Sequence, residues 1–110
     1  MEFPSEEALM AIGTVQEFEG FDTEIYDAVC QKVNFPDDWP DGLLYHAAGP
    51  AESGGMRITD QWQSAEQFQR FMETKIQPAV QEVFSERGTE PAGPPKTTIF
   101  EIHSTAHTHA

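Results

Sequence analysis

Three side chains near the middle of the sequence have the types and spacing needed for acid–base chemistry on a flat ligand. His46 lies in one predicted strand, and Asp60 and Trp62 lie in the next, across a hairpin loop. Pairing Gly49 with Gly55 places all three on one face of the sheet, because side chains alternate between faces along a strand. A carboxylate can orient a histidine ring for proton transfer, and an indole can stack on an aromatic ligand. We therefore predict His46 and Asp60 as catalytic residues and Trp62 as a ligand-binding residue.

The same residues also have a purely structural interpretation. The pairing above sets His46 opposite Ile58 and Leu44 opposite Asp60, and a slip of one residue would reverse the faces. His46 would then be a buried histidine bonded to a backbone group. A carboxylate buried alone costs free energy. Asp60 is therefore either paired with His46 or hydrated near the end of its strand, and the hydrated or structural role is favoured.

Further candidates lie in the C-terminal half of the chain. Phe68 and Phe71 belong to a predicted amphipathic helix, and we predict that both bind ligand as walls of a pocket. His103 ends the last predicted strand, which would hold it in place as another ligand-binding residue. Together with His107 and His109 it could ligate a metal. That segment is terminal and polar, so we expect a flexible tail and no metal site.

Four strands and two helices must position these side chains. β-Branched and aromatic residues between turn-forming residues predict the strands, and helical hydrophobic spacing predicts a helix after the first and third of them. This β-α-β-β-α-β order predicts an α+β, ferredoxin-like fold, with a four-stranded antiparallel sheet and two helices on one face. The predicted strands cover residues 10–18, 42–49, 56–62 and 97–103.

The helices carry recognisable start and stop signals. Asp22 and Thr23 can both cap the first helix. It ends before Phe35, because the residue before a proline avoids the helical conformation. The second begins at a capping box that starts with Ser64, carries a kink or restart near Pro78, and stops by Gly88. The apolar stripe of the first helix consists of Ile25, Val29 and Val33, with Tyr26 and Cys30 beside it.

Length and charge limit the classes of function. The 110 residues fit one domain, which we place at residues 10–103, with a mobile arm at 1–9 and a flexible tail at 104–110. Nineteen acidic residues against six basic ones give a formal net charge of −13. Phosphate backbones and anionic membrane surfaces repel such a chain. We therefore expect neither a nucleic-acid nor a membrane partner.

The cysteine content is compatible with a reducing compartment. A single cysteine, Cys30, allows no intrachain disulfide. The segment Met1–Glu7 lacks the basic start and apolar centre of a signal peptide, and no apolar run approaches the ~20 residues that span a bilayer. We therefore expect a cytoplasmic location.

Three segments carry a resemblance to a known superfamily. They are Gly42–Pro50 (GLLYHAAGP), Asp60–Phe68 (DQWQSAEQF) and Thr98–His103 (TIFEIH). In these segments the chain resembles the dimeric α/β barrel superfamily, in particular uncharacterised bacterial members related to antibiotic-biosynthesis monooxygenases. The Trp-x-Ser-x-Glu-x-Phe part resembles the strand-to-helix junction of these barrels. The resemblance extends over residues 10–103 and implies a homodimer whose sheets pack against each other.

The resemblance also implies a cavity between the sheet and the helices. Members of the superfamily use it for cofactor-free oxygenation, cyclisation or isomerisation of small apolar or aromatic metabolites. The haem-degrading branch uses a histidine of the second helix as iron ligand, and residues 64–86 contain none. We therefore expect a cofactor-independent enzyme in which His46 is the acid–base group and Asp60 orients it. The alternative is a non-catalytic ligand-binding or assembly protein, which full activity of a His46→Ala variant would favour.

Overall fold

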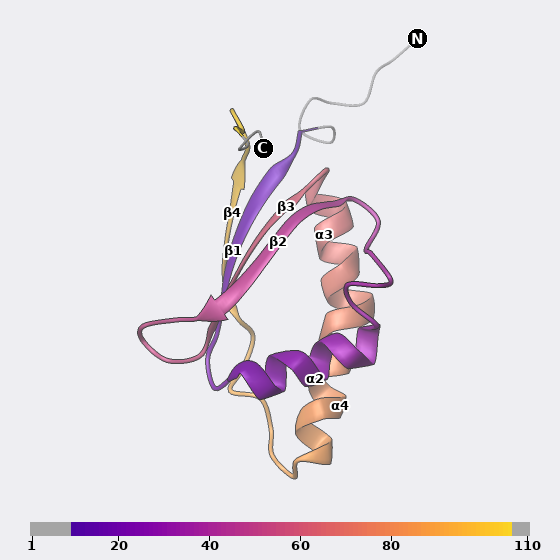
Figure 1. Ribbon diagram of the computed structural model, residues 1–110, viewed down its shortest axis with the longest axis vertical. Coiled ribbons are helices and arrows are strands. Elements are labelled where there is room, and N and C mark those ends of the chain that lie inside the picture. The colour runs from indigo at the N-terminus through magenta and orange to yellow at the C-terminus, as the bar shows by residue number, and fades with distance from the viewer. Residues whose placement is uncertain (1–9, 107–110) are drawn as a thin grey trace.

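The structure, a computed structural model, describes residues 10–106 and contains all the predicted strands and helices. The predicted arm at 1–9 and the tail residues His107 and His109 lie outside the described residues. Figure 1 shows a twisted sheet with the helices on one side of it. The strands are β1 (Ile12–Phe18), β2 (Leu43–Pro50), β3 (Met56–Trp62) and β4 (Lys96–Glu101), and the helical segments are α2 (Thr23–Val33), α3 (Ala65–Phe71), η1 (Met72–Ile76) and α4 (Gln77–Glu86).

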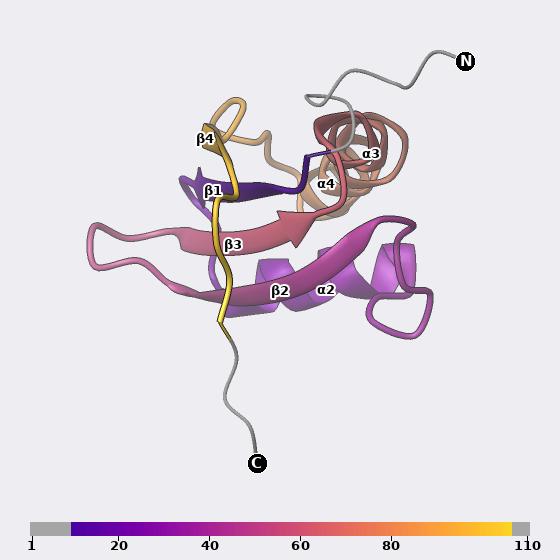
Figure 2. The same ribbon diagram turned by 90° about the horizontal axis from the view of Figure 1, so that it is seen from above.

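The sheet is antiparallel throughout, with the strand order β2-β3-β1-β4. Each helical connection crosses one face of the sheet, so the first and third strands become central neighbours and the second and fourth become the edges (Figures 1 and 2). This arrangement confirms the predicted ferredoxin-like α+β fold. No helix among residues 10–106 is long and apolar enough to cross a membrane.

Local sequence signals determine where the helices begin and end. Oδ1 of Asp22 accepts a hydrogen bond from the backbone N–H of Ile25 at 2.8 Å, which starts α2. Asn34 ends it in the left-handed conformation, with φ at 55°. The Oγ of Ser64 accepts from the backbone N–H of Gln67 at 3.2 Å, which starts α3. Both predicted N-terminal caps are confirmed.

The second helical region is one rod, formed by α3, η1 and α4, with a wide turn in its middle (Figure 1). Within η1 the hydrogen bonds widen to π-helical spacing, and the N–H of Gln77 bonds to the carbonyl of Met72. Pro78 follows directly and has no N–H to offer the carbonyl of Thr74. The irregularity predicted near Pro78 therefore takes the form of a π turn rather than a break.

The core between the sheet and the helices divides into two clusters. The larger cluster packs α2 and α4 against one end of the central strands, and the smaller packs α3 against the other end. Met72, in η1, packs against both. The buried members of the larger cluster are Phe18, Phe21, Ile25, Val29, Met56, Ala79, Val83 and Phe84, and those of the smaller are Ile12, Leu43, Trp62 and Phe68.

The opposite face of the sheet carries exposed aromatic side chains. Tyr45, Gln61, Gly13 and Phe100 form one row across the four strands. Tyr45 is 49% exposed and Phe100 is 52% exposed. No helix among residues 10–106 covers this row.

Candidate functional site

His46 and Asp60 face each other directly across β2 and β3. The predicted register, with Gly49 opposite Gly55, is wrong by two residues. Gly55 has a positive φ of 79° and belongs to the turn instead of the ladder. A shift of two residues keeps each side chain on its face. His46, Asp60 and Trp62 therefore share the inner face of the sheet, as predicted.

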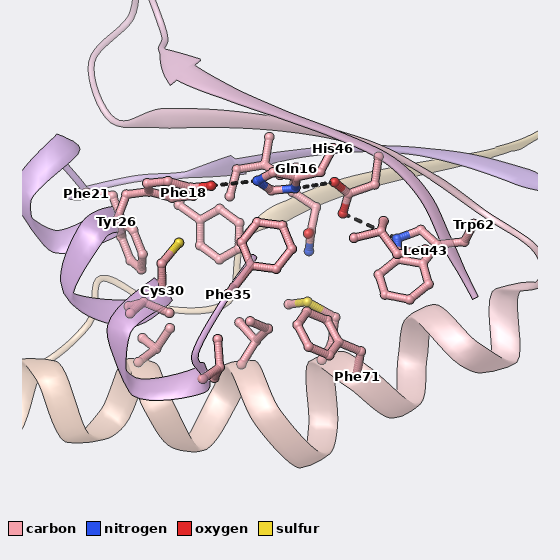
Figure 3. Close-up of a pocket in the computed structure, with 17 residues that line it drawn as sticks. Gln16, Phe18, Phe21, Tyr26, Cys30, Phe35, Leu43, His46, Trp62 and Phe71 are labelled. Atoms are coloured by element: carbon pink, nitrogen blue, oxygen red, sulfur yellow. Dashed lines mark hydrogen bonds and ion pairs between the residues drawn. The ribbon is translucent and has the colours of Figure 1, made fainter. Parts of the chain in front are cut away.

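A chain of hydrogen bonds connects four side chains from α2, β2 and β3. Nδ1 of His46 lies 2.6 Å from Oδ1 of Asp60, and Nε2 lies 2.6 Å from the hydroxyl oxygen of Tyr26. Trp62 donates its indole N–H to Oδ2 of Asp60 at 3.3 Å. Figure 3 shows these contacts as one continuous path. Both ring nitrogens of His46 and both carboxylate oxygens of Asp60 therefore have partners.

Asp60 is buried, and the favoured expectation that it is hydrated is wrong. Its side chain is 8% exposed and that of His46 is 18% exposed. The smaller core cluster, which includes Trp62, extends over this end of β3 and excludes solvent. A carboxylate in such a place needs hydrogen-bond donors to offset its lost hydration. His46 and Trp62 supply them.

Tyr26 is the member of this hydrogen-bonded network that no sequence pattern identifies. It lies beside the apolar stripe of α2, and its hydroxyl meets a strand residue 20 positions away in the sequence. Burial raises the pKa of Tyr26 well above the range in which tyrosines ionise, and Cys30 and Asp60 raise it further. The phenol is therefore neutral at neutral pH and can donate to Nε2 of His46. Helical spacing indicates which residues are buried, but not which strand residue each one meets.

The space between the two core clusters contains a cavity of about 60 Å³. Such a volume holds about two water molecules, whereas a cavity that accepts benzene measures about 150 Å³. A ring-shaped ligand can therefore enter only if a lining side chain moves. Met72 lines the cavity and has the flexible thioether chain that adapts most readily. The residues that bring polar atoms to the lining are Gln16, Tyr26, Cys30, His46, Asp60 and Trp62.

Two of the four predicted ligand-binding residues line this cavity and two do not. Trp62 and Phe71 are part of the lining. Phe68 instead packs its ring against Trp62 within the smaller core cluster, with ring centroids 5.9 Å apart. His103 is exposed, and it lies beyond β4, which ends at Glu101, earlier than predicted. The structure thus corrects the expected positions of Phe68 and His103.

Cys30, on α2, lines the cavity wall, where its reactivity as a nucleophile is low. Burial raises the pKa of its thiol, so the nucleophilic thiolate is scarce at neutral pH. Among residues 10–106, no group of three or more His, Cys, Asp or Glu side chains is placed to hold a metal ion. The hydrogen-bonded chain is therefore the feature of this cavity best suited to chemistry.

Solved structures provide the informative comparison. No protein-family model matches the sequence, and no curated protein is similar to it. A protein of unknown function from Nitrosomonas europaea superposes with a TM-score of 0.64 at 12% identity, over 94% of this chain and 99% of that chain. A monooxygenase of Streptomyces coelicolor, solved with the ligand nanaomycin D, superposes with a TM-score of 0.54 at 15% identity, over 93% and 95%.

A third structure is that of a cofactor-independent oxygenase. SnoaB, a cofactor-independent oxygenase from Streptomyces nogalater, superposes with a TM-score of 0.53 at 12% identity, over 87% of this chain and 94% of that chain. Identities this low establish the fold and not the activity. The chain has the ferredoxin-like α+β fold of the antibiotic biosynthesis monooxygenase-like proteins.

Proposed function

We propose that this chain is a cofactor-independent enzyme that transfers protons to and from a small, neutral, apolar or aromatic metabolite. The observation that carries the proposal is the continuous hydrogen-bonded chain of Tyr26, His46 and Asp60 at an otherwise mainly apolar cavity. Burying such a network costs more than burying apolar side chains of the same size. Networks of titratable groups in clefts are therefore characteristic of catalytic sites.

The proposed proton path has a direction. Asp60 accepts a hydrogen bond from Nδ1–H of neutral His46, so Nε2 accepts a hydrogen bond from the Tyr26 hydroxyl. When a ligand C–H beside a carbonyl transfers its proton to the Tyr26 oxygen, the Tyr26 proton passes to Nε2. The products are an enolate ligand, a neutral tyrosine and an imidazolium next to the Asp60 carboxylate. Oxygenation, cyclisation and isomerisation can all begin with such a loss of a C–H proton.

Charge and size define the class of ligand. The 17 lining residues include Asp60 and contain no lysine or arginine. Together with the net charge of −13, this repels anionic metabolites. The apolar lining favours rings, which enter as Met72 moves aside. A neutral one-ring or two-ring ketone has the required acidic C–H bond and carries no charge.

Exchange of carbon-bound hydrogen tests the proposal without knowledge of the natural substrate. The probes are 1-indanone and 2-tetralone in deuterated buffer, and proton NMR follows the loss of the signals next to the carbonyl group. We expect the protein to accelerate the exchange. His46→Ala, Asp60→Asn and Tyr26→Phe should each lower the acceleration by about 100-fold or more, the usual contribution of a positioned acid or base.

Matched substitutions away from the cavity serve as controls. Glu24→Gln on the exposed side of α2 and Tyr45→Phe on the opposite face of the sheet should leave the exchange rate unchanged. Binding of the probes is measured in parallel by changes in the protein NMR spectrum. Probes that bind without exchanging faster than in buffer would favour the alternative, a non-catalytic ligand-binding protein. Full exchange activity of His46→Ala would also reject the proposed proton path.

We further propose that the exposed face of the sheet pairs with the same face of a second copy. Tyr45 and Phe100 lie in one row on this face, and burying aromatic side chains of this size stabilises an interface. Sedimentation equilibrium should show a dimer that Phe100→Glu dissociates. Gln81→Glu, on the exposed side of α4, should leave the dimer intact. A wild-type chain that stays monomeric over the whole concentration series would overturn this proposal.

A further inference from the structure

Gln16 places a carboxamide inside the sheet–helix layer, where an apolar side chain would suffice for packing. It lies on β1, faces the helices and is 3% exposed. Its neighbours across the sheet are Ile58 on β3 and Thr97 on β4. Figure 3 shows the side chain extending from the sheet toward the helices, with the amide group at its tip in the region of the cavity.

The amide uses only part of its hydrogen-bonding capacity. Among residues 10–106 it makes one side-chain hydrogen bond, from Nε2 to Oγ1 of Thr97 at 3.3 Å. The Thr97 hydroxyl donates its own proton to the carbonyl of Pro95 at 3.4 Å, so its oxygen is free to accept and the nitrogen of Gln16 faces it. This leaves Oε1 and one N–H of Gln16 without a hydrogen bond among the described residues.

Because Oε1 and one N–H of Gln16 have no partner within residues 10–106, a ligand that forms hydrogen bonds with them should bind more tightly than one that does not. Among the described residues, Oγ1 of Thr14 is the fully enclosed side-chain polar atom without a partner, so Oε1 of Gln16 remains accessible to a water in the cavity. A ligand hydroxyl can replace the hydrogen bonds of such a water, whereas an apolar group cannot. Oε1 can accept from a hydroxyl group, and the free N–H can donate to its oxygen. A hydrocarbon of the same shape would fill the cavity and leave both groups unpaired.

The position of Gln16 relative to the proton path is suited to a ring-shaped ligand. Gln16 and His46 lie on the inner face, two strands and one two-residue step apart. With ~4.8 Å between strands and ~3.3 Å per residue, their backbones are roughly 12 Å apart. Their side chains reach the same cavity. One or two fused rings can therefore contact Tyr26 at one end and Gln16 at the other.

We propose that Gln16 is a specificity-determining residue that binds a hydroxyl group of the ligand, so that the cavity selects neutral hydroxylated ring compounds over the corresponding hydrocarbons. This inference rests on the function proposed above, because it concerns the same cavity. It adds a polar recognition point that is separate from the proton path of Tyr26, His46 and Asp60.

Phenol and toluene test this inference, because they have nearly the same shape and differ in the hydroxyl group. Their affinities for the full chain are measured by NMR titration, and the nitrogen-15 signal of the Gln16 side-chain amide reports the location. We expect phenol to bind about tenfold more tightly than toluene, in keeping with one buried hydrogen bond. Only phenol should shift the amide signal strongly.

Substitutions assign the preference to Gln16. Gln16→Leu should abolish the preference for phenol or reverse it. Gln16→Met, a second apolar substitution with a longer and more flexible side chain, should have the same effect and replaces the leucine variant if that variant folds poorly. Gln31→Leu on the exposed side of α2 is the matched control and should keep the wild-type ratio.

The outcomes separate this inference from the proposed function. An unchanged ratio in folded Gln16 variants, equal affinities in the wild type, or no binding of either probe would overturn the role of Gln16. The hydrogen-exchange assay is scored independently, so a cavity that binds phenol through Gln16 but exchanges no C–H proton would reject only the catalytic proposal.

Discussion

The hydroxyl of Tyr26 lies 2.6 Å from Nε2 of His46, on the side of the ring opposite to Asp60. An ionised carboxylate only accepts hydrogen bonds, so Nδ1 must carry the proton in neutral His46. The lone pair of Nε2 is then occupied by the tyrosine hydroxyl. The atom of this network available to a ligand is therefore the oxygen of Tyr26, and not a nitrogen of His46.

This geometry predicts one tautomer of the neutral His46 ring. Nitrogen-15 NMR at a pH where the ring is neutral should show a protonated Nδ1 and an unprotonated, hydrogen-bonded Nε2. Tyr26→Phe should shift the Nε2 signal by removing its donor and leave the tautomer unchanged. Asp60→Asn should allow the two tautomers to mix, because the carboxylate that selects one of them is gone. A protonated Nε2 in the wild type would contradict the proposed direction of the proton path.

The raised pKa of Tyr26 predicts a loss of stability at alkaline pH. In the unfolded chain tyrosine ionises near its ordinary pKa of about 10, whereas burial keeps Tyr26 protonated in the folded chain. The stabilisation is therefore complete below about pH 10 and is lost as the pH rises above it, by at most about 1.4 kcal/mol per pH unit, and by less because the side chain is partly solvated.

Urea unfolding from about pH 8 to about pH 11 measures this slope. Tyr26→Phe should flatten it, because phenylalanine has no proton to lose. Tyr45→Phe, which removes the only other tyrosine, is the matched control and should preserve the contribution of Tyr26. Identical slopes in the wild type and Tyr26→Phe would show that the Tyr26 hydroxyl is not protected from ionisation.

The buried pair of His46 and Asp60 should show energetic coupling that added salt does not weaken, unlike the coupling of an exposed pair. His46→Ala and Asp60→Asn should each reduce the free energy of unfolding by about 1–3 kcal/mol, since each leaves a buried partner unsatisfied. The double variant should be more stable than the sum of the two losses predicts, with a coupling of about 1 kcal/mol.

The exposed ion pair between Arg57 and Glu17, 2.6 Å apart, provides the comparison. Its two side chains are 56% and 36% exposed, so its coupling should lie within about 0.2–1 kcal/mol and fall with added salt. Strictly additive effects of the substitutions at His46 and Asp60 would indicate that Asp60 is hydrated in solution and has no fixed partner.

The sequence was sufficient to predict the elements and the face on which the site lies. Alternation along β2 and β3 placed His46, Asp60 and Trp62 together, and an error of two residues in the register left this result intact because the period of a strand is two. The caps at Asp22 and Ser64 were predictable because they depend on contacts within one helical turn.

Contacts between distant elements could not be predicted in the same way. The meeting of Tyr26 and His46 depends on how α2 is rotated over the sheet, and helical periodicity does not determine that rotation to within one residue. Phe68 and Phe71 lie one turn apart, yet only Phe71 reaches the cavity. The position of His103 depended on where β4 ends, and strand ends are the least certain part of a sequence-based prediction.

A cross-strand contact on the opposite face of the sheet predicts a specific double-mutant effect. The ring of Phe100 on β4 lies directly over Gly13 on β1, and a Cβ atom added to Gly13 would overlap that ring. Gly13→Ala must therefore displace the aromatic ring, and we expect it to reduce the free energy of unfolding by about 1 kcal/mol.

Phe100→Ala should remove that penalty, because no ring is left to displace and alanine suits a strand better than glycine does. Urea unfolding of the two single variants and the double variant gives the coupling, expected at about 1 kcal/mol in favour of the double variant. Ala47→Gly, on the same face of β2, controls for the general cost of exchanging glycine and alanine in this sheet. If Gly13→Ala costs the same with and without the Phe100 ring, the ring does not rest on Gly13 in solution, and Phe100 is free to contact another surface.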